Sequence, residues 1–496
     1  METLDADVIV VGAGPTGLML ASELRLAGVT AIVVERLTEP MKQSRALGFS
    51  ARTIEEFDQR GLLTRFPEFD TIPIGHFGGL PIDYRIVEGG SYGARGVPQS
   101  LTEGILADWA ARLGAEVRRG QEVVSLTAGD DHVKVELATP DGPRTLRAAY
   151  LVGCDGGRSV VRKQAGIDFP GTEPVIEMWL ADVRGVQLRP RFAGERVPGG
   201  MVMVLPMGPE INRVVVYERA TGLRGTSEPP TFPEVADAWE RLTGEDIHGA
   251  TPLWVSFFTD SSRQAAEYRR GRVLVAGDAA HVHLPIGGQG MSAGVQDAVN
   301  LGWKLAAEIH GYAPPGLLDT YHSERHPAGA RVVANTLAQR IVYLGSDEMD
   351  PLRLVLGELL EHDDVKRHLV GMVTGLDIRF DVGPGTHPLL GRRLPDVDLV
   401  VDGAEKSSVY ELLHPARGVL LDLSDDADLR FAAAPWADRV DVVTAAPQGD
   451  GGTVLDGADA VLVRPDGYVA WIAPDDEGAA VTEVLARWFG VTERAT

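Results

Sequence analysis

A glycine-rich turn between an apolar strand pattern and a helical pattern constrains this chain most. Residues 7–11 predict a buried strand, GAGPTG follows at 12–17, and the helical spacing of residues 18–28 leads to a second apolar run that ends on Glu35. Glu35 lies 23 residues after the first glycine of this G-x-G-x-x-G. A strand–helix–strand unit with that turn and that acid predicts dinucleotide binding on a parallel sheet. A glycine-rich turn in an unrelated α/β protein is the alternative.

Each residue of this unit has a physical task. Gly12 permits the tight turn, Gly14 lets backbone approach a pyrophosphate, and Gly17 lets helix and strand pack closely. The helix N-terminus offers unpaired N–H groups and a partial positive charge to the pyrophosphate. Glu35 can accept hydrogen bonds from ribose hydroxyls and would repel a 2′-phosphate.

The stretch AGDAAHVHLPIGGQGM at 276–291 suits the other half of a dinucleotide, if that half is a flavin. Asp278 ends an apolar strand, where it can bind ribityl hydroxyls. Pro285 fixes the next turn, and Gly287, Gly288 and Gly290 offer N–H groups without side chains that would obstruct a flat ring. A helix that begins near 290 points its N-terminus at the same place, where it can stabilise the anionic reduced ring.

The patterns along the rest of the chain predict further layers. Residues 36–70 predict polar helix, 121–152 predict a β-meander, and 171–260 alternate like antiparallel strands. Residues 317–380 are mostly helical in pattern. Gly and Pro at 381–396 predict a linker.

After the linker, residues 397–490 follow the order β-α-β-α-β-β-α, with a hairpin around Pro465-Asp466-Gly467. This order resembles a thioredoxin-like domain. It contains no cysteine, so dithiol chemistry is excluded. Packing, or contact between two copies in a homodimer, is its expected role.

Charge and cysteine content exclude several classes of protein. The formal net charge of −24 argues against nucleic acid and anionic membrane as partners. Cys154 is the single cysteine, which excludes a disulfide within the chain and a Cys-rich zinc site. No apolar run reaches the length of about 18 residues that a membrane span needs. The acidic first residues do not form a signal peptide, so we expect a cytoplasmic protein.

Three motifs together carry a family resemblance. GAGPTG with Glu35, CDGGRS at 154–159 and AGDAAHVHLPIGGQGM resemble the signatures of class A FAD-dependent aromatic hydroxylases, the para-hydroxybenzoate hydroxylase type. Five further stretches resemble aromatic polyketide hydroxylases, with the angucycline oxygenases closest: SRALGFSART (44–53), GHFGGLPID (75–83), VPQSLTE (97–103), GTEPVIEMWLADV (171–183) and YHSERHP (321–327). Ser292 departs from the pattern, which often has Asn there.

The resemblance implies an α/β protein of three domains. A Rossmann-like FAD-binding domain of the GR2 type would comprise residues 1–72, 97–170 and 262–385. An inserted antiparallel β-sheet domain for the substrate would comprise 73–96 and 171–261. The C-terminal thioredoxin-like domain, which lacks CxxC, would comprise 392–496.

The resemblance also assigns site residues. Arg45, Pro285 and Gly288 would shape the flavin environment during catalysis, with no dedicated base. Residues assigned to the cofactors are Gly12, Gly14, Pro15, Thr16, Gly17, Glu35, Arg36, Arg45, Gln99, Asp155, Gly156, Arg158, Gly277, Asp278, Pro285, Gly287, Gly288, Gln289, Gly290 and Met291. Candidates for the substrate pocket, between the flavin and the β-rich layer, are Phe77, Trp179, Met203 and Tyr217; each is also an ordinary core residue.

The implied reaction is hydroxylation of an aromatic, angucycline-type polyketide in antibiotic biosynthesis. NADPH or NADH would reduce FAD, and molecular oxygen would then give a flavin C4a-hydroperoxide that transfers OH to a phenolic ring. The protein would orient the substrate, exclude water and stabilise charge.

Four other functions remain as alternatives. Baeyer–Villiger oxygenation of a polyketide ketone is compatible with the same scaffold, although the second GxGxxG of class B enzymes is absent. A halogenase lacks its W-x-W signature here, and a reductase that never uses oxygen is a further enzyme alternative. A non-catalytic flavin-binding module is the alternative from another class. We expect no metal site, because His281 and His283 lack a clear third ligand.

Overall fold

The N-terminal strand–helix–strand unit forms as predicted and lies at the centre of a parallel sheet. The computed structural model describes residues 3–87, 89–208, 210–402, 405–475 and 477–492. β1 (Ala6–Val11), α1 (Pro15–Leu26) and β2 (Ala31–Glu35) make up the unit. The sheet has the order β19 (Arg269–Arg270), β20 (Val273–Val275), β11 (Arg144–Gly153), β1, β2 and β8 (Glu116–Arg119). Neighbouring strands from β20 to β8 are parallel.

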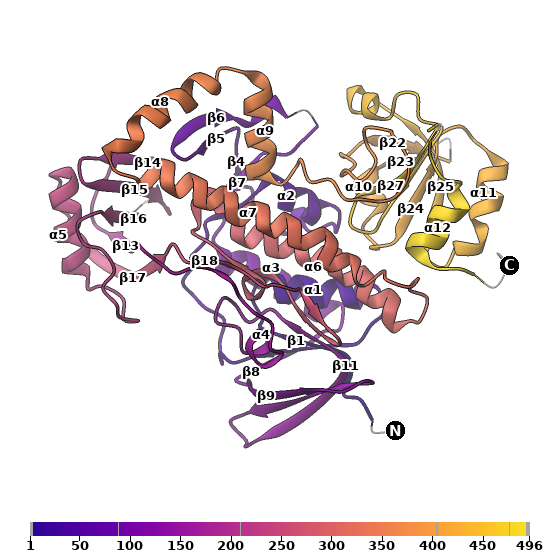
Figure 1. Ribbon diagram of the computed structural model, residues 1–496, viewed down its shortest axis with the longest axis horizontal. Coiled ribbons are helices and arrows are strands. Elements are labelled where there is room, and N and C mark those ends of the chain that lie inside the picture. Colours follow the sequence, from indigo (N-terminus) through magenta and orange to yellow (C-terminus); the bar gives the residue numbers. More distant parts are fainter. Residues whose placement is uncertain (1–2, 88, 209, 403–404, 476, 493–496) are drawn as a thin grey trace.

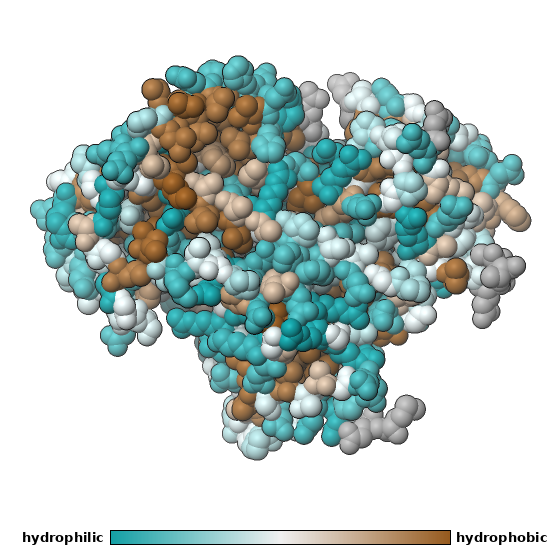
Figure 2. All heavy atoms as spheres, in the orientation of Figure 1, coloured by the Kyte–Doolittle hydropathy of each residue, from teal (hydrophilic) through white to brown (hydrophobic). Residues whose placement is uncertain are grey.

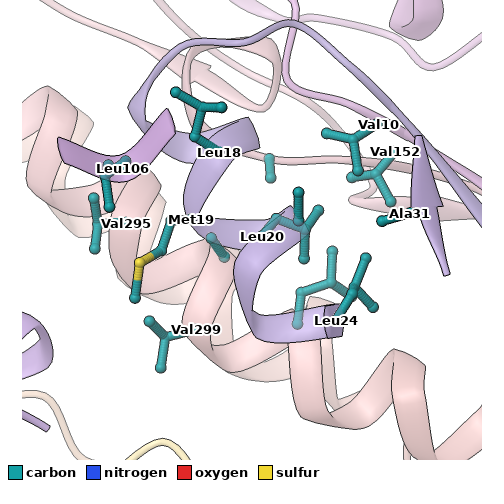
Figure 3. Close-up of a cluster of buried hydrophobic side chains, with 14 of the residues drawn as sticks. Val10, Leu18, Met19, Leu20, Leu24, Ala31, Leu106, Val152, Val295 and Val299 are labelled. Carbon is teal, nitrogen blue, oxygen red and sulfur yellow. The ribbon is translucent and has the colours of Figure 1, made fainter. Parts of the chain in front are cut away.

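The alternation of β1 buries one set of side chains on each face of this sheet. Val8 and Val10 pack with α1, α3 (Gln99–Arg112) and α6 (Gln289–Ile309), as Figure 3 shows for Val10, Leu18, Leu106 and Val295. Ile9 and Val11 face the meander of β9 (Glu122–Ala128), β10 (Val133–Ala138) and β11. Burial of each such aliphatic side chain contributes about 1.5–3 kcal/mol.

Most of the helices come after the strands of the parallel sheet in the chain and pack on one another. α7 (Thr320–Leu344) lies along α6 and continues through a short turn into α8 (Asp350–Leu359) and α9 (Asp363–Thr374) (Figure 1). α4 (Val160–Gln164) follows β11. The helix predicted over 36–70 is confirmed only for α2 (Ala51–Asp58) and a 3₁₀ turn at Leu63–Arg65. Residues 36–50 are largely exposed, so their polarity reflects contact with solvent and not a helical face.

Short strands connect these layers. β3 (Gly48–Phe49), β7 (Gly93–Arg95) and β4 (Asp70–Ile72) form one small sheet. β12 (Gly171–Thr172), β18 (Ser262–Gln264) and β21 (His281–Val282) form another. The hairpin of β5 (Ile74–Phe77) and β6 (Leu80–Asp83) packs beside α9.

The strands predicted over 171–260 form a separate antiparallel sheet. Its order is β14 (Arg191–Val197), β15 (Gly200–Pro206), β16 (Ile211–Glu218), β13 (Glu177–Arg184) and β17 (Thr251–Thr259). One face packs on α5 (Phe232–Thr243) and the other on Leu284 and Ile286. Because side chains alternate along each strand, the parity of a residue number decides which face it joins.

The C-terminal residues form a six-stranded sheet of their own, at the right of Figure 1. Its order is β23 (Glu405–Ser408), β22 (Asp398–Val401), β25 (Val440–Pro447), β24 (Gly418–Asp422), β26 (Ala460–Val463) and β27 (Val469–Ala473), with α10 (Val409–Leu412), α11 (Ala427–Ala433) and α12 (Val481–Phe489). β24 and β25 are parallel, whereas β26 and β27 are antiparallel around the predicted turn at 465–467. This unit packs on α6 through Trp303 and Ala307. Its Arg393 and Arg464 form buried ion pairs with Glu55 of α2 and Glu324 of α7.

On the face shown in Figure 2, a large group of hydrophobic residues lies over α8 and its neighbours. Leu352, Leu354, Val355 and Leu359 of α8 are exposed there. Among the residues that the structure describes, none of the helices is long and apolar enough to cross a membrane. In the same described ranges, no cluster of three His, Cys, Asp or Glu side chains could hold a metal ion.

Candidate functional site

Four turns meet at the carboxyl ends of four neighbouring parallel strands. The glycine turn follows β1, Glu35 ends β2, the Asp155 turn follows β11, and the Asp278 turn follows β20. Backbone hydrogen bonds continue the ladder into the turns: Gly12 N donates to Val34 O (2.8 Å), and Cys154 N donates to Val11 O (2.8 Å). The carboxyl edge of an open parallel sheet is where ligands bind in this type of architecture.

The glycine turn leaves space on one side only. Gly12 has φ +106°, and a Cβ there would lie 2.4 Å from Cys154 O. A Cβ on Gly17 would lie 2.0 Å from Gly12 O. A Cβ on Gly14 would meet no atom within 4 Å among the described residues. Gly12 and Gly17 therefore close the turn against the protein, while Gly14 faces open space at the N-terminus of α1.

The Glu35 carboxylate is held against this turn. Its Oε2 accepts a hydrogen bond from Ala13 N and its Oε1 from Leu37 N, both at 2.9 Å. Two backbone donors orient the carboxylate while the residue stays half-buried, so it can still accept from a ligand.

The Asp155 turn combines a helix cap with an unused acceptor. Asp155 Oδ2 accepts from Val160 N (2.6 Å) and Val161 N (3.2 Å), the first residues of α4. Its buried Oδ1 has no hydrogen-bond partner among the described residues. Gly156 adopts φ +81°, and Arg158 is exposed beside it.

The Asp278 turn packs closely on α1. Gly277 and Gly294 both lie against Thr16, because a Cβ on either would come within 2.6 Å of the Thr16 hydroxyl. Asp278 itself is exposed. The absence of side chains at two positions therefore brings α1, α6 and the turn together.

Asp297 of α6, which lies outside the three motifs, holds this turn through its carboxylate. Its buried carboxylate accepts from Gly277 N (3.0 Å), His281 Nε2 (2.8 Å) and Arg325 Nε (2.8 Å). Burial alone would raise the pKa of Asp297, but Arg325 and His281 bring it below its ordinary value. His281 thus acts as a partner of Asp297.

The loop 285–288 presents bare backbone at the start of α6. Pro285, Gly287 and Gly288 are exposed, and the two glycines have φ +73° and +67°. Left-handed geometry at successive positions favours glycine. The first N–H groups of a 21-residue helix follow at once, with their partial positive charge. Burial lowers the pKa of nearby His283, whose Nδ1 lies 2.9 Å from Leu284 O.

A ladder of buried amides connects this loop to the β5–β6 hairpin. Gln289 donates to Ile286 O (3.3 Å) and accepts from Asn335 Nδ2 (2.9 Å). Gln339 donates to Asn335 Oδ1 (3.0 Å) and accepts from Gly78 N (3.1 Å). Because every rung is buried, a displacement of the hairpin at Gly78 would strain the loop at Ile286.

Several other residues predicted to bind the cofactors are exposed or half-buried. Arg36 and Arg45 are exposed, and Arg45 O accepts from Arg213 Nη1 (2.9 Å). Gln99 begins α3, where its backbone N donates to Ala46 O (3.0 Å). Met291 is half-buried in the first turn of α6. The Ser292 hydroxyl accepts from Ser50 N (3.0 Å) and so ties α6 to α2.

The four predicted substrate residues do not share one face. Met203 and Tyr217 lie on the sheet face that packs on Leu284 and Ile286. Trp179 lies on the opposite face, among the side chains that pack on α5. Phe77 belongs to a third cluster, between the β5–β6 hairpin and α9.

Three residues on the sheet face that packs on Leu284 and Ile286 are not among the predicted substrate residues, although the two-residue period of the strands places them there. Leu180 shares that face, and Asp182 and Arg213 follow the same parity on β13 and β16. Arg213 Nε and Nη2 bind the two oxygens of Asp182 at 2.7 and 2.8 Å. Strand parity applied to 177–184 and 211–218 would have identified all three.

The site has the features that bound FAD requires. Open space at Gly14 suits a pyrophosphate, an unused Asp155 oxygen and the exposed Asp278 supply acceptors, and bare backbone at Gly287 and Gly288 admits a flat ring. The donors at the N-termini of α1 and α6 match negative charge at the phosphates and at a reduced ring.

Comparisons with known proteins agree with this geometry. Residues 5–336 match the family described as FAD binding domain, and residues 387–492 match the C-terminal domain of aromatic-ring hydroxylases. The 12-dehydrotetracycline 5-monooxygenase/anhydrotetracycline 6-monooxygenase of Streptomyces rimosus subsp. rimosus is 45% identical, over 98% of this chain and 99% of the relative.

Two solved structures are similar over almost the whole chain. CabE, an aromatic hydroxylase from angucycline biosynthesis, is 58% identical with a TM-score of 0.95, over 98% of this chain and all of that one. AlpK is 66% identical with a TM-score of 0.91, over 99% of this chain and all of that one. The family predicted from the three motifs is confirmed.

Proposed function

Because the chain belongs to the FAD-dependent aromatic-ring hydroxylases, a family of flavoprotein monooxygenases, we propose that its substrate is an angucycline-type aromatic polyketide. It would hydroxylate this substrate with NADPH or NADH as electron donor. The small-molecule substrate would lie between loop 285–288 and the antiparallel sheet. The observation that carries this proposal is the apolar cluster that Leu284 and Ile286 form with Met178, Leu180 and Tyr217. It puts an aromatic-binding face beside the bare backbone that suits the flavin ring.

The residues of the cofactor site have distinct tasks in this proposal. Gly12, Gly14, Gly17 and Glu35 hold the ADP half, and Asp278 binds the ribityl chain. The remaining predicted cofactor residues lie around the same edge of the sheet, with Asp155 and Arg158 serving both FAD and the nicotinamide donor. When bound, FAD accepts electrons from that donor and activates molecular oxygen for transfer to the ring.

Residues of the sheet and the loop orient the substrate and exclude water. The apolar side chains of β13 and β16 remove solvent from the reacting ring, which strengthens every electrostatic contact there. The N–H groups at Gly288 and the first turn of α6 stabilise negative charge that develops at the ring edge. Arg213, fixed by Asp182, positions the loop that carries Arg45 through its contact with Arg45 O.

We also propose a separate role for each of the three domains. Residues 1–72, 97–170 and 262–385 bind FAD in the GR2 manner, and 73–96 with 171–261 hold the substrate. Residues 392–496 form a thioredoxin-like unit without redox activity, which the pairing of β24, β25, β26 and β27 supports. Within one chain, this unit packs against the FAD-binding domain. In a homodimer, we propose that the same unit forms the contact between the two copies.

NADPH consumption in air tests this function. We expect the FAD-loaded protein to consume NADPH faster when an angular tetracyclic phenol is added, and the product to gain one oxygen on a ring. Protein stripped of FAD and then reloaded is the control for the cofactor. A lactone product would replace the proposal with Baeyer–Villiger oxygenation, and NADPH consumption without any oxygenated product from a panel of polycyclic phenols would refute it.

A further inference from the structure

An open cavity of about 290 Å³ lies between the end of β16 and the C-terminal half of α7. Its apolar wall includes Ile176, the ring of Tyr217 and Leu344. Arg219 and Arg340 also line it. The volume is near the lower end of the range for small-molecule sites, about 300 Å³. The cavity thus combines aromatic-sized apolar space with two cationic side chains.

The two guanidinium groups are fixed but not satisfied. Arg219 Nη2 donates to Gly345 O (3.0 Å), and Arg340 Nη1 donates to Asp260 Oδ2 (2.6 Å). The Nε atom of each is buried and has no hydrogen-bond partner in the described part of the chain. The Nη groups that these contacts leave free can donate to a ligand, and an anionic oxygen is the acceptor that binds guanidinium most strongly.

The Asp260 carboxylate already neutralises the charge of Arg340. Asp260 accepts from Val175 N (2.8 Å) and Ile176 N (3.0 Å) in addition to Arg340. Arg219 contacts the Tyr217 hydroxyl and the Gly345 carbonyl, which are both uncharged. One positive charge at the cavity is therefore not neutralised by these contacts.

Tyr217 connects this cavity to the flavin side of the sheet. It belongs to the cluster that contains Leu284 and Ile286, which flank Pro285. Ile176 and Leu344 pack with the same cluster. A ligand in the cavity would therefore contact side chains of the same cluster that borders loop 285–288.

We propose that this cavity holds the end of the aromatic substrate remote from the flavin, and that Arg219 and Arg340 bind an anionic oxygen substituent there, a carboxylate or an ionised phenol. The inference rests on the proposed function, because it assigns the class of substrate for the same site. The alternative is a purely structural role, in which Arg219 only caps the carbonyl end of α7.

Binding of three matched anthraquinones to the FAD-loaded protein distinguishes these roles. The probes differ at one ring position, which carries a carboxylate, a hydroxyl or a methyl group. We expect the carboxylate probe to bind about tenfold more tightly than the methyl probe, with the hydroxyl probe approaching the carboxylate above the pKa of its phenol. Dissociation constants come from the change in flavin absorbance or probe fluorescence.

Substitutions locate that preference. Arg219→Gln removes one cation, and Arg340→Lys keeps a partner for Asp260 but removes the Nε–H. Both should reduce the preference for the carboxylate several-fold while affinity for the methyl probe stays close to that of the wild type. Arg241→Gln is the control, because Arg241 lies on α5, its 55% exposed side chain pairs with Glu218, and neither residue lines the cavity. FAD content and unfolding temperature confirm that each variant is folded.

The outcomes separate this inference from the proposed function. Equal affinity of the wild type for the three probes, or an unchanged preference in both variants, overturns the cavity assignment even if the probes are hydroxylated. Preference for the carboxylate that disappears in both variants supports the assignment even if no probe stimulates NADPH consumption, in which case the proposed hydroxylation fails instead.

Discussion

Replacement of Asp297 by Asn would test what holds the Asp278 turn. The Asp297 carboxylate is buried and binds three donors, from Gly277, His281 and Arg325. Asn has nearly the same shape but offers one oxygen and an NH₂ group, which would face a donor. Arg325, whose side chain is 3% exposed, would lose the carboxylate that compensates its charge.

The expected loss is large relative to total stability. Removal of one partner from a buried ion pair costs about 3–5 kcal/mol, and an ordinary domain has only about 5–15 kcal/mol. Urea unfolding should show this loss in Asp297→Asn. Because Gly277 N loses its carboxylate acceptor, the turn that presents Asp278 should also loosen, and the dissociation constant of FAD should rise about tenfold or more.

A matched substitution controls for the chemistry of the change. Asp141→Asn removes a carboxylate that is 80% exposed and lies 3.5 Å from Arg144. Surface pairs of this kind contribute about 0–1 kcal/mol, so its unfolding should resemble that of the wild type. If Asp297→Asn unfolds within about 1 kcal/mol of the wild type and binds FAD equally well, the role assigned to Asp297 is refuted.

Four further substitutions have expected outcomes. Gly14→Ala should fold normally but lose most of its affinity for FAD, because the added Cβ enters the open space assigned to the pyrophosphate. Gly17→Ala should fail to fold, because its Cβ would lie 2.0 Å from the carbonyl oxygen of Gly12. Circular dichroism measures the folding of both variants, and titration with FAD measures their affinity. Burial would raise the pKa of Glu324, but Arg464 and Lys304 lower it to about 2, so its ionised form stabilises the fold above pH 4.5 and this contribution is lost as pH falls toward about 2. Glu324→Gln should flatten that part of the acid-unfolding curve and reduce stability at neutral pH. Asn335→Leu should cost about 1–3 kcal/mol and, by loosening loop 285–288, lower the fraction of NADPH oxidation that yields hydroxylated product.

Each of these expectations has a result that contradicts it. Normal FAD affinity in Gly14→Ala would show that the pyrophosphate lies elsewhere. An acid-unfolding curve of Glu324→Gln that keeps its slope between about pH 4.5 and 2 would remove Glu324 as its source. Unchanged coupling in Asn335→Leu, at equal FAD content, would mean that the amide ladder does not position the loop.

Local sequence determined the cofactor edge of this protein. The spacing of Gly12, Gly14 and Gly17 between a strand and a helix follows from backbone sterics, which act within a few residues. The same is true of the glycines at 287 and 288, whose left-handed geometry is a property of the chain itself. The alternation over 171–260 likewise determined that a second, antiparallel sheet would form, because alternation is the local signature of a half-buried strand.

Tertiary structure decided which polar residues are buried. Arg52, Glu55 and Glu56 lie on a charged segment that predicts a solvated helix, yet each is at most 3% exposed. The C-terminal unit covers them and supplies partners: Arg52 donates to Asp466 O (2.9 Å), and Arg393 pairs with Glu55 at 2.9 Å. These partners are more than 300 residues away in sequence, so no local pattern contains them.

The same distinction between local patterns and contacts across long sequence separations applies to the site. Each turn proposed to hold FAD is local, so the sequence alone can predict it. The Asp297 carboxylate, the amide ladder and the face on which Trp179 lies depend on how α6, α7 and the antiparallel sheet pack together. Sequence thus determined where the cofactor edge lies, and packing between distant elements decided what holds that edge and which side chains face it.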